Sequence, residues 1–228
     1  RCMISERIVE YPLVFQKITK PHSLVLDIGS SESFLPYQLA TLGHRVVASD
    51  LLPPRQRWKK RSAQRRWVVA EDWEGYALKH PGLHFVREDA MRLGHADNTF
   101  DFVTAISTIE HFGMGAYGAP EVPDADLSVM RALRRILVAD GRVILTFPFN
   151  DIEEVIPHFE HSYTPDRVAT LLRGWHVEAE EFWEPDKQIL GRWVKWRPAT
   201  MRSAAEASAR TGLKGLACFA ARRLEANP

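Results

Sequence analysis

A glycine and two carboxylates occur at positions where a chain can hold a nucleoside. Gly29 follows a short apolar run, Asp50 ends the next such run, and Asp89 follows a third. Small residues at a turn into a helix let the backbone approach a ligand and direct amide N–H groups at it. The Asp50 carboxylate can accept hydrogen bonds from both hydroxyls of a ribose, each worth about 1.5–3 kcal/mol. The Asp89 carboxylate and the amide of Ala90 can read an adenine edge. Together these residues predict a nucleoside-binding site.

A second candidate group lies in segment 107–113, Ser-Thr-Ile-Glu-His-Phe-Gly. His111 is the best candidate for a general base, because an unperturbed imidazole with a pKa near 6.5 is largely neutral at pH 7. Glu110 can orient that imidazole or help to bind a metal. The structural alternative is a histidine that caps the following helix or holds the loop. His158 and His161 could join Glu110 and Glu160 as metal ligands, but loop histidines are commoner than ligands, so we expect no metal.

Alternating strand and helix signals predict how these residues are positioned. Apolar runs indicate strands at 23–28, 45–50, 83–87, 100–106, 142–147 and 215–222, and a half-exposed strand begins at Trp175. Stretches with helical spacing lie between them, and Ser33 and Thr164 are the expected N-caps of two of these helices. This alternation is typical of a mostly parallel sheet with helices on both faces. Such a sheet binds ligands at the carboxyl ends of its strands, where the glycine and both carboxylates lie.

Length and composition fit one globular domain. The chain has 228 residues, of which 45% are hydrophobic and 26% charged, and its formal net charge is +1. Cys2 and Cys218 make neither a disulfide framework nor a zinc site. No apolar run approaches the length of a signal peptide or a membrane span, so we expect a cytoplasmic protein with no membrane partner. We expect an N-terminal helix in 1–20, a cofactor-binding core in 21–150, and an acceptor-side segment with closing strands in 151–228.

The ordered set of motifs resembles the class I S-adenosylmethionine-dependent methyltransferases, in particular their type-11 members. Val-Leu-Asp-Ile-Gly at 25–29 resembles the first motif of that family, 100–107 resembles its fourth-strand motif, and 133–148 resembles the helix and fifth strand that follow. The resemblance implies a Rossmann-like α/β fold. Its seven-stranded, mostly parallel sheet has helices on both faces and an antiparallel last strand. A bacterial subgroup with Glu-Arg-Ile-Val-Glu-Tyr-Pro, here at 6–12, is loosely associated with glycan or secondary-metabolite tailoring.

The resemblance also implies the site residues. The cofactor-binding residues expected for S-adenosylmethionine are Tyr11, Asp27, Gly29, Ser30, Ser31, Asp50, Leu51, Asp89, Ala90 and Ser107. The expected catalytic residues are His111 and Glu110, and the expected acceptor-binding residues are Tyr117, His161 and Tyr163. One departure is that Ser31 and Ser33 stand where the family usually has glycines. Because serine is small and its hydroxyl can bind the methionyl carboxylate, we interpret the loop as altered but usable.

Motifs that are missing narrow the expected acceptor. Methyltransferases acting on exocyclic base amines usually carry an Asn/Asp-Pro-Pro-aromatic motif after strand four, and 107–111 here reads Ser-Thr-Ile-Glu-His. Those acting on carbon-5 of pyrimidines need a cysteine near the site, and both cysteines lie near the chain ends. We therefore expect transfer to an oxygen of a sugar or another small metabolite, with nitrogen as the second choice. The sequence indicates no oligomeric state.

Two other functions stay open at this point. Segment 55–66 holds seven basic residues among twelve, beside Trp58 and Trp67, which would suit RNA phosphates and bases. A solvated arginine-rich helix explains the same pattern, so nucleic acid is not the favoured partner. Because Ser31 and Ser33 replace the usual glycines of the cofactor loop, a non-catalytic cofactor-binding protein is a further alternative.

Overall fold

A computed structural model describes residues 6–30, 33–51, 80–186 and 195–224. One eight-stranded sheet has the order β3-β2-β1-β4-β5-β10-β8-β9. Its strands are β1 (Leu24–Ile28), β2 (Arg45–Asp50), β3 (Leu83–Arg87), β4 (Phe100–Ile106), β5 (Leu137–Phe149), β8 (Trp175–Asp186), β9 (Lys195–Ala199) and β10 (Gly215–Arg223). Strands β1 to β5 pair in parallel, whereas β10 runs antiparallel to both of its neighbours.

The expected Rossmann-like architecture is confirmed. The predicted bounds of β2, β3 and β4 agree with those observed, and β10 is the antiparallel strand between β5 and β8. The eighth strand, β9, was not predicted; it pairs with β8 at the sheet edge. The first helix, α1 (Arg7–Lys17), lies inside the predicted range 1–20.

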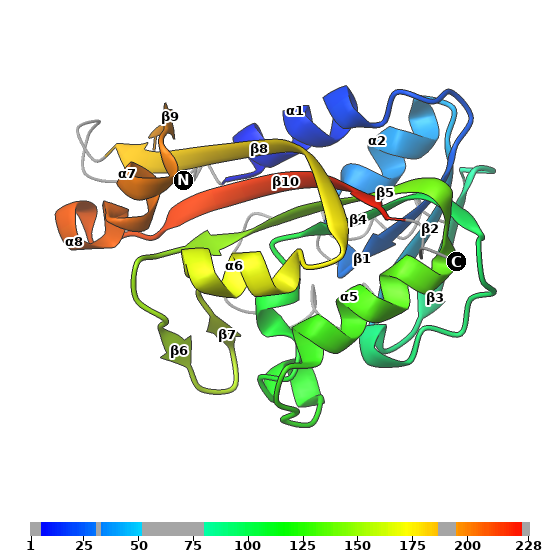
Figure 1. The fold of residues 1–228 in the computed structure, drawn as a ribbon. Coiled ribbons are helices and arrows are strands. Elements are labelled where there is room, and N and C mark those ends of the chain that lie inside the picture. Colours follow the sequence, from blue (N-terminus) through cyan, green and yellow to red (C-terminus); the bar gives the residue numbers. More distant parts are fainter. Residues whose placement is uncertain (1–5, 31–32, 52–79, 187–194, 225–228) are drawn as a thin grey trace, which may run out of the picture.

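Helices cover both faces of the sheet (Figure 1). On one face lie α1 and α2 (Leu35–Thr41), and on the other lie α5 (Ala125–Ile136) and α6 (Pro165–Leu171). The short helices α7 (Met201–Ala205) and α8 (Ala207–Thr211) precede β10. The Thr164 side chain caps α6 as predicted, and the Ser33 hydroxyl accepts from the Leu35 amide although Phe34 is the N-cap residue of α2.

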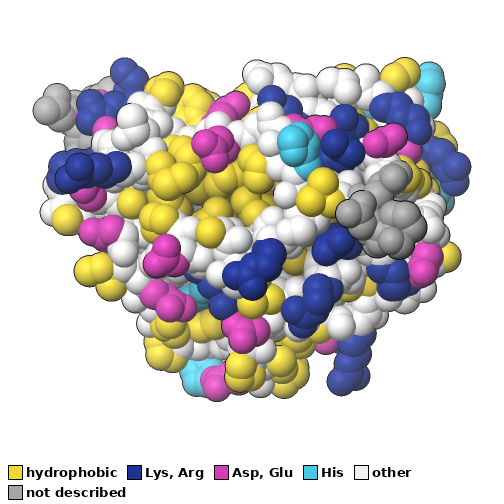
Figure 2. Space-filling model, viewed as in Figure 1, with side chains coloured by type: hydrophobic (Ala, Val, Ile, Leu, Met, Phe, Trp, Pro, Cys, Tyr) yellow, Lys and Arg dark blue, Asp and Glu magenta, His cyan; other side chains and the backbone are white. Residues whose placement is uncertain are grey.

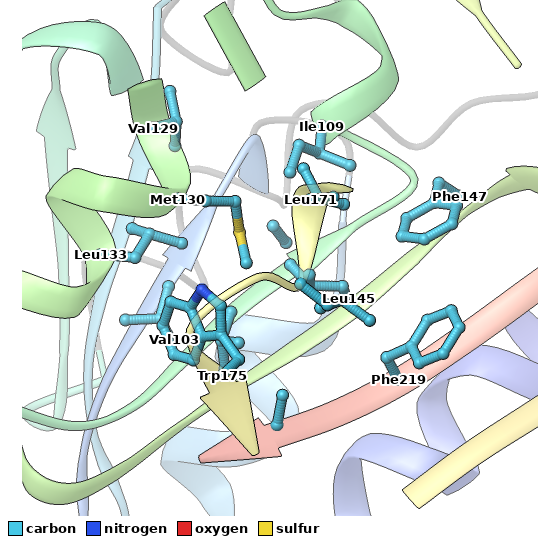
Figure 3. Close-up of a cluster of buried hydrophobic side chains, with 14 of the residues drawn as sticks. Val103, Ile109, Val129, Met130, Leu133, Leu145, Phe147, Leu171, Trp175 and Phe219 are labelled. Carbon is cyan, nitrogen blue, oxygen red and sulfur yellow. The ribbon is translucent and has the colours of Figure 1, made fainter. Parts of the chain in front are cut away.

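Each face of the sheet has its own hydrophobic core. Figure 3 shows the cluster under α5, to which α5 contributes Met130 and Leu133, β5 contributes Leu145 and β10 contributes Phe219. The cluster on the other face packs side chains of α1 and α2 against alternate residues of the same strands. Because the inner strands β1, β4 and β10 are buried on both faces, their sequences are nearly continuous apolar runs, and these runs predicted their positions.

A buried carboxylate fixes α1 across the ends of two strands. Glu10 is fully buried and accepts hydrogen bonds from the hydroxyls of Ser107 and Thr146, at 2.6 Å each. Arg7 donates to the same carboxylate at 2.6 Å and to the carbonyl of Ile106 at 3.2 Å. A buried charge with three partners is costly to disrupt. The network therefore holds α1 beside the carboxyl ends of β4 and β5.

A second buried carboxylate fixes the segment that follows β5. Asp126 on α5 pairs with Arg167 on α6 and accepts from the Tyr163 hydroxyl at 3.0 Å. This segment carries the small hairpin of β6 (Val155–Ile156) and β7 (Glu160–His161).

The surface drawn in Figure 2 carries acidic and basic side chains close together, with a hydrophobic area over β8 and β10 between α6 and α7. None of the helices within the described ranges has the length and apolar character that a membrane crossing requires.

Candidate functional site

A cavity of about 590 Å³ opens at the carboxyl ends of the parallel strands. Six of the predicted cofactor residues line it: Gly29, Asp50, Leu51, Asp89, Ala90 and Ser107. They come from the ends of β1, β2, β3 and β4, which the parallel register brings to one edge of the sheet. This is the edge at which an open α/β sheet binds its ligands.

Gly29 has the geometry that close approach of a ligand requires. Its φ is +75°, a left-handed conformation that side chains rarely adopt, and its amide donates to the Ser49 carbonyl at 2.8 Å. A Cβ atom here would overlap the side chain of Thr108. The glycine is therefore required by the close packing of Thr108 against the turn, and the turn itself lies on the cavity wall.

The two carboxylates predicted to bind adenosine occupy different environments. Asp50 is buried at the last position of β2 and lines the cavity, where it suits a ribose diol. Asp89 already accepts a hydrogen bond from the Met91 amide at 2.9 Å and so caps the short 3-10 helix η2 (Ala90–Arg92). The structure thus gives the Asp89 carboxylate a local structural partner in addition to its place on the cavity wall.

Three of the predicted cofactor-binding residues, Tyr11, Asp27 and Ser30, do not line the cavity but lie next to residues that do. Asp27 is buried and accepts from the Thr104 hydroxyl, and burial raises its pKa to about 7. The Tyr11 hydroxyl lies 2.8 Å from the Ser33 hydroxyl, which does line the cavity. Ser30 donates to a β2 carbonyl at 3.2 Å. These contacts support the loop, and Ser31 lies outside the described residues.

The predicted base and its neighbour lie on the cavity wall, in η3 (Ile109–His111). The His111 Nδ1 atom is 2.5 Å from the Phe159 carbonyl oxygen. Because a carbonyl only accepts, Nδ1 must carry the proton, and Nε2 then holds the lone pair of the neutral ring. The Nε2 atom lies 3.9 Å from a Glu110 oxygen. This assignment leaves His111 able to accept a proton at Nε2.

The Glu110 carboxyl is buried, and one of its two oxygens lacks a hydrogen-bond partner among the described residues. The residue is 2% exposed, and its Oε2 atom has no hydrogen-bond partner in the part of the chain that the structure describes. Burial, reinforced by the charges of Glu10 and Glu160, raises the pKa of the Glu110 carboxyl well above its usual range. A carboxyl in this state favours a proton and can donate or accept a hydrogen bond inside the cavity.

Three potential metal ligands come together beside the base. One ligand atom each from Glu110, His111 and Glu160 lie within 4.8 Å of one another, and these donor types suit several divalent ions. Lys214 places its ammonium 3.1 Å from Glu160 and 3.2 Å from Glu154. This ammonium already provides a positive charge next to the cluster.

The two histidines considered at first as metal ligands do not join this cluster. His158 is exposed and pairs with Glu121 at 3.1 Å, and His161 is buried 4.0 Å from Asp126. The cluster therefore uses His111 in their place.

The predicted acceptor residues divide into two groups. Tyr117 lines the cavity, and its ring stands edge-on to the His111 ring with centroids 5.5 Å apart. His161 and Tyr163 are buried and do not line the cavity. Instead they pack beside each other against Asp126 and help to hold the segment after β5.

Several cavity-lining residues were not predicted, among them Phe159, Leu213 and Lys214. One of these positions has a signal in the sequence. Because β10 is antiparallel to β5, its first residue, Gly215, lies beside Phe149 at the carboxyl end of β5. The residues just before an antiparallel last strand must therefore reach the site.

The chain is similar to proteins of one family. A family model described as a methyltransferase domain matches residues 26–145. No curated protein matches the chain by sequence. Its fold is similar to a Burkholderia thailandensis 1,6-didemethyltoxoflavin N1-methyltransferase, solved with its substrate and S-adenosylhomocysteine. That match has a TM-score of 0.64 at 16% identity and covers 97% of this chain and 79% of the other.

Two further solved structures have related folds. A putative Bacillus halodurans methyltransferase has a TM-score of 0.62 at 15% identity, with 95% of this chain and 100% of the other covered. The [4+2]-cyclase SpnF has a TM-score of 0.59 at 15% identity, with coverages of 95% and 80%. At these identities the similarity establishes the fold, which also carries a reaction other than methyl transfer in SpnF.

Proposed function

The chain belongs to the methyltransferase-domain family with S-adenosylmethionine as its methyl donor, and we propose that it methylates a hydroxyl oxygen of a small molecule. The acceptor class includes sugars and other metabolites. The observation that supports the proposal is the His111 ring on the cavity wall: the Phe159 carbonyl holds its Nδ1, and this places the lone pair of the neutral ring at Nε2.

The cofactor would lie along the carboxyl ends of β1 to β4. The Gly29 turn lies on the cavity wall, Asp50 would provide a ribose-binding carboxylate, and the Asp89–Ala90 pair is next along the wall. When bound, S-adenosylmethionine supplies an electrophilic methyl group on a sulfonium. The protein then has to hold the acceptor in line with that methyl group, and such positioning can contribute about 7–11 kcal/mol.

The proton of the acceptor hydroxyl is assigned to His111. Nε2 takes the proton while Nδ1 stays bonded to the Phe159 carbonyl, so the ring keeps its orientation throughout. A base positioned in this way typically contributes about 10²–10⁴-fold. Glu110, with an oxygen 3.9 Å from Nε2, can form a hydrogen bond to the acceptor hydroxyl.

Transfer to nitrogen is the second candidate. The side chains of Glu110 and Glu160 on the cavity wall could accept hydrogen bonds from the N–H groups of an amine. The Burkholderia enzyme of similar fold is an N1-methyltransferase. RNA methylation stays a prediction, since segment 55–66 lies outside the described residues.

The test uses S-adenosylmethionine that carries a trideuterated methyl group. The purified protein is incubated with matched panels of hydroxyl compounds and amines, and mass spectrometry locates the label. Label on a hydroxyl oxygen is the expected result. Label on amines alone would contradict the oxygen proposal, and label on no compound would favour a non-catalytic protein.

A further inference from the structure

Large apolar side chains gather at the acceptor side of the cavity. Tyr117, Ile156, Phe159 and Leu213 line it, and their exposed fractions are 42%, 39%, 43% and 38%. They come from η4 (Ala116–Gly118), from β6 and its turn, and from the residue pair before β10. Exposed apolar side chains scattered singly are ordinary, but a group of them around one opening marks a surface that binds apolar molecules.

The charged groups nearby are directed largely at one another. Lys214 bridges Glu154 and Glu160 at 3.2 and 3.1 Å. A side chain engaged with an opposite charge offers a ligand less than an unpaired one. This part of the wall therefore does not require a charged acceptor.

Aromatic rings surround the proposed base. The His111 ring centroid lies 5.5 Å from that of Tyr117 and 5.0 Å from that of Phe159, and such spacings are typical of aromatic pairs. A planar ring can extend this arrangement. A phenol is also the better proton donor to an imidazole, because phenols titrate near 10, whereas water, the limit for an unactivated hydroxyl, titrates near 15.7.

We propose that the acceptor is a planar, largely apolar molecule that presents a phenol-type hydroxyl to His111, an inference that rests on the proposed methyl transfer to oxygen. The phenol oxygen forms a bond to the methyl carbon, and the carbon–sulfur bond breaks with its electron pair left on sulfur. The phenol proton passes to Nε2 of His111.

The preference for a planar phenol over a sugar is tested by measuring binding without methyl transfer. The protein is saturated with S-adenosylhomocysteine and titrated with each probe in a calorimeter. The probes are 7-hydroxycoumarin, a planar phenol with one carbonyl, and methyl β-D-glucopyranoside. The coumarin should bind at least tenfold more tightly. Phe159→Ala should weaken coumarin binding about tenfold, because it removes a ring at the cavity but keeps the carbonyl that holds His111. Ile152→Ala is the matched control, since Ile152 is 70% exposed and does not line the cavity, and binding should not change.

The outcomes separate this inference from the function on which it rests. Equal or tighter binding of the glucoside would overturn it, as would coumarin binding that Phe159→Ala leaves unchanged. Methyl transfer is then measured separately with labelled S-adenosylmethionine. If coumarin binds at this cavity but no hydroxyl compound is methylated, the proposed function fails while the binding preference stands.

Discussion

The His111 Nδ1 atom lies 2.5 Å from the Phe159 carbonyl oxygen, across a sequence separation of 48 residues. The contact joins the loop after β4 to the turn of the β6–β7 hairpin. It fixes both the orientation of the imidazole and the nitrogen that carries its proton. The proposed base therefore depends on the segment after β5 as well as on its own loop.

The first prediction concerns this base. His111→Ala should lower the turnover number by about 10²–10⁴-fold, because the hydroxyl proton loses its acceptor. Affinity for S-adenosylhomocysteine should stay the same, since the cofactor wall is intact. Turnover is measured at saturating substrate, and affinity by calorimetry. His158→Ala provides the control, because His158 lies on the surface beside Glu121 and should tolerate the change. Equal turnover in both variants would remove His111 as base.

The second prediction concerns the first turn. Gly29→Ala should lower the free energy of unfolding by about 1–3 kcal/mol and weaken cofactor binding, because its φ is +75° and a Cβ would overlap Thr108. Gly94→Ala is the matched control, since a Cβ there meets nothing within 4 Å. Denaturant unfolding gives the stabilities. Similar behaviour of the two variants would show that the turn does not need its glycine.

Much of the cofactor half was predictable from the sequence. Strands β2 and β4 have the predicted bounds because each is a short, largely buried apolar run, whereas β3 is a mostly exposed edge strand whose bounds were also predicted. The turn at Gly29 and the carboxylate at Asp50 follow directly from those strands. Parallel strands bring their carboxyl ends together, so once the strands are located the cofactor wall is largely determined.

The third prediction concerns the buried carboxyl of Asp27. Burial raises its pKa from 3.8 to about 7, so the folded protein keeps a proton that the unfolded chain loses between pH 4 and pH 7. Stability contributed by this proton is full below pH 4 and falls as the pH rises, by at most about 1.4 kcal/mol per unit. In Asp27→Asn, which has no proton to lose at this position, this decrease in the free energy of unfolding should be absent.

Unfolding free energies of both proteins between pH 4 and pH 7 check this prediction. The raised pKa of Glu110 acts in both proteins and cancels in their difference. Wild type should lose stability relative to Asp27→Asn as the pH rises. A difference that stays constant over this range would show that Asp27 is not buried as a protonated acid.

The fourth prediction concerns metal removal. Because the Lys214 ammonium already stands 3.1 Å from Glu160, turnover should not need a divalent ion. Extensive dialysis against EDTA should leave turnover within about twofold, as expected for a reaction that depends mainly on positioning and a base. Activity lost on dialysis and restored by Mn²⁺ or Zn²⁺ would instead assign Glu110, His111 and Glu160 to a metal site.

The acceptor half was less predictable, for physical reasons. Tyr163 and His161 are polar residues after β5, yet a buried carboxylate on α5 holds them away from the cavity. Such long-range partners leave no local pattern. Strand β9 is a half-exposed edge strand that contains Pro198, and both features weaken a strand signal. Phe159 contributes through a backbone carbonyl, which any residue type has.

The cofactor site is tested most directly by calorimetric titration with S-adenosylhomocysteine of wild type, Asp50→Ala and the surface control Asp97→Ala. Asp50 is buried on the cavity wall, whereas Asp97 is exposed and pairs with Arg135. We expect wild type and Asp97→Ala to bind S-adenosylhomocysteine, and Asp50→Ala to bind it at least about tenfold more weakly, since each charge-assisted hydrogen bond to a ribose is worth about 1.5–3 kcal/mol. Unchanged affinity in Asp50→Ala, or no binding by wild type, would contradict the assignment of this cavity to the methyl donor.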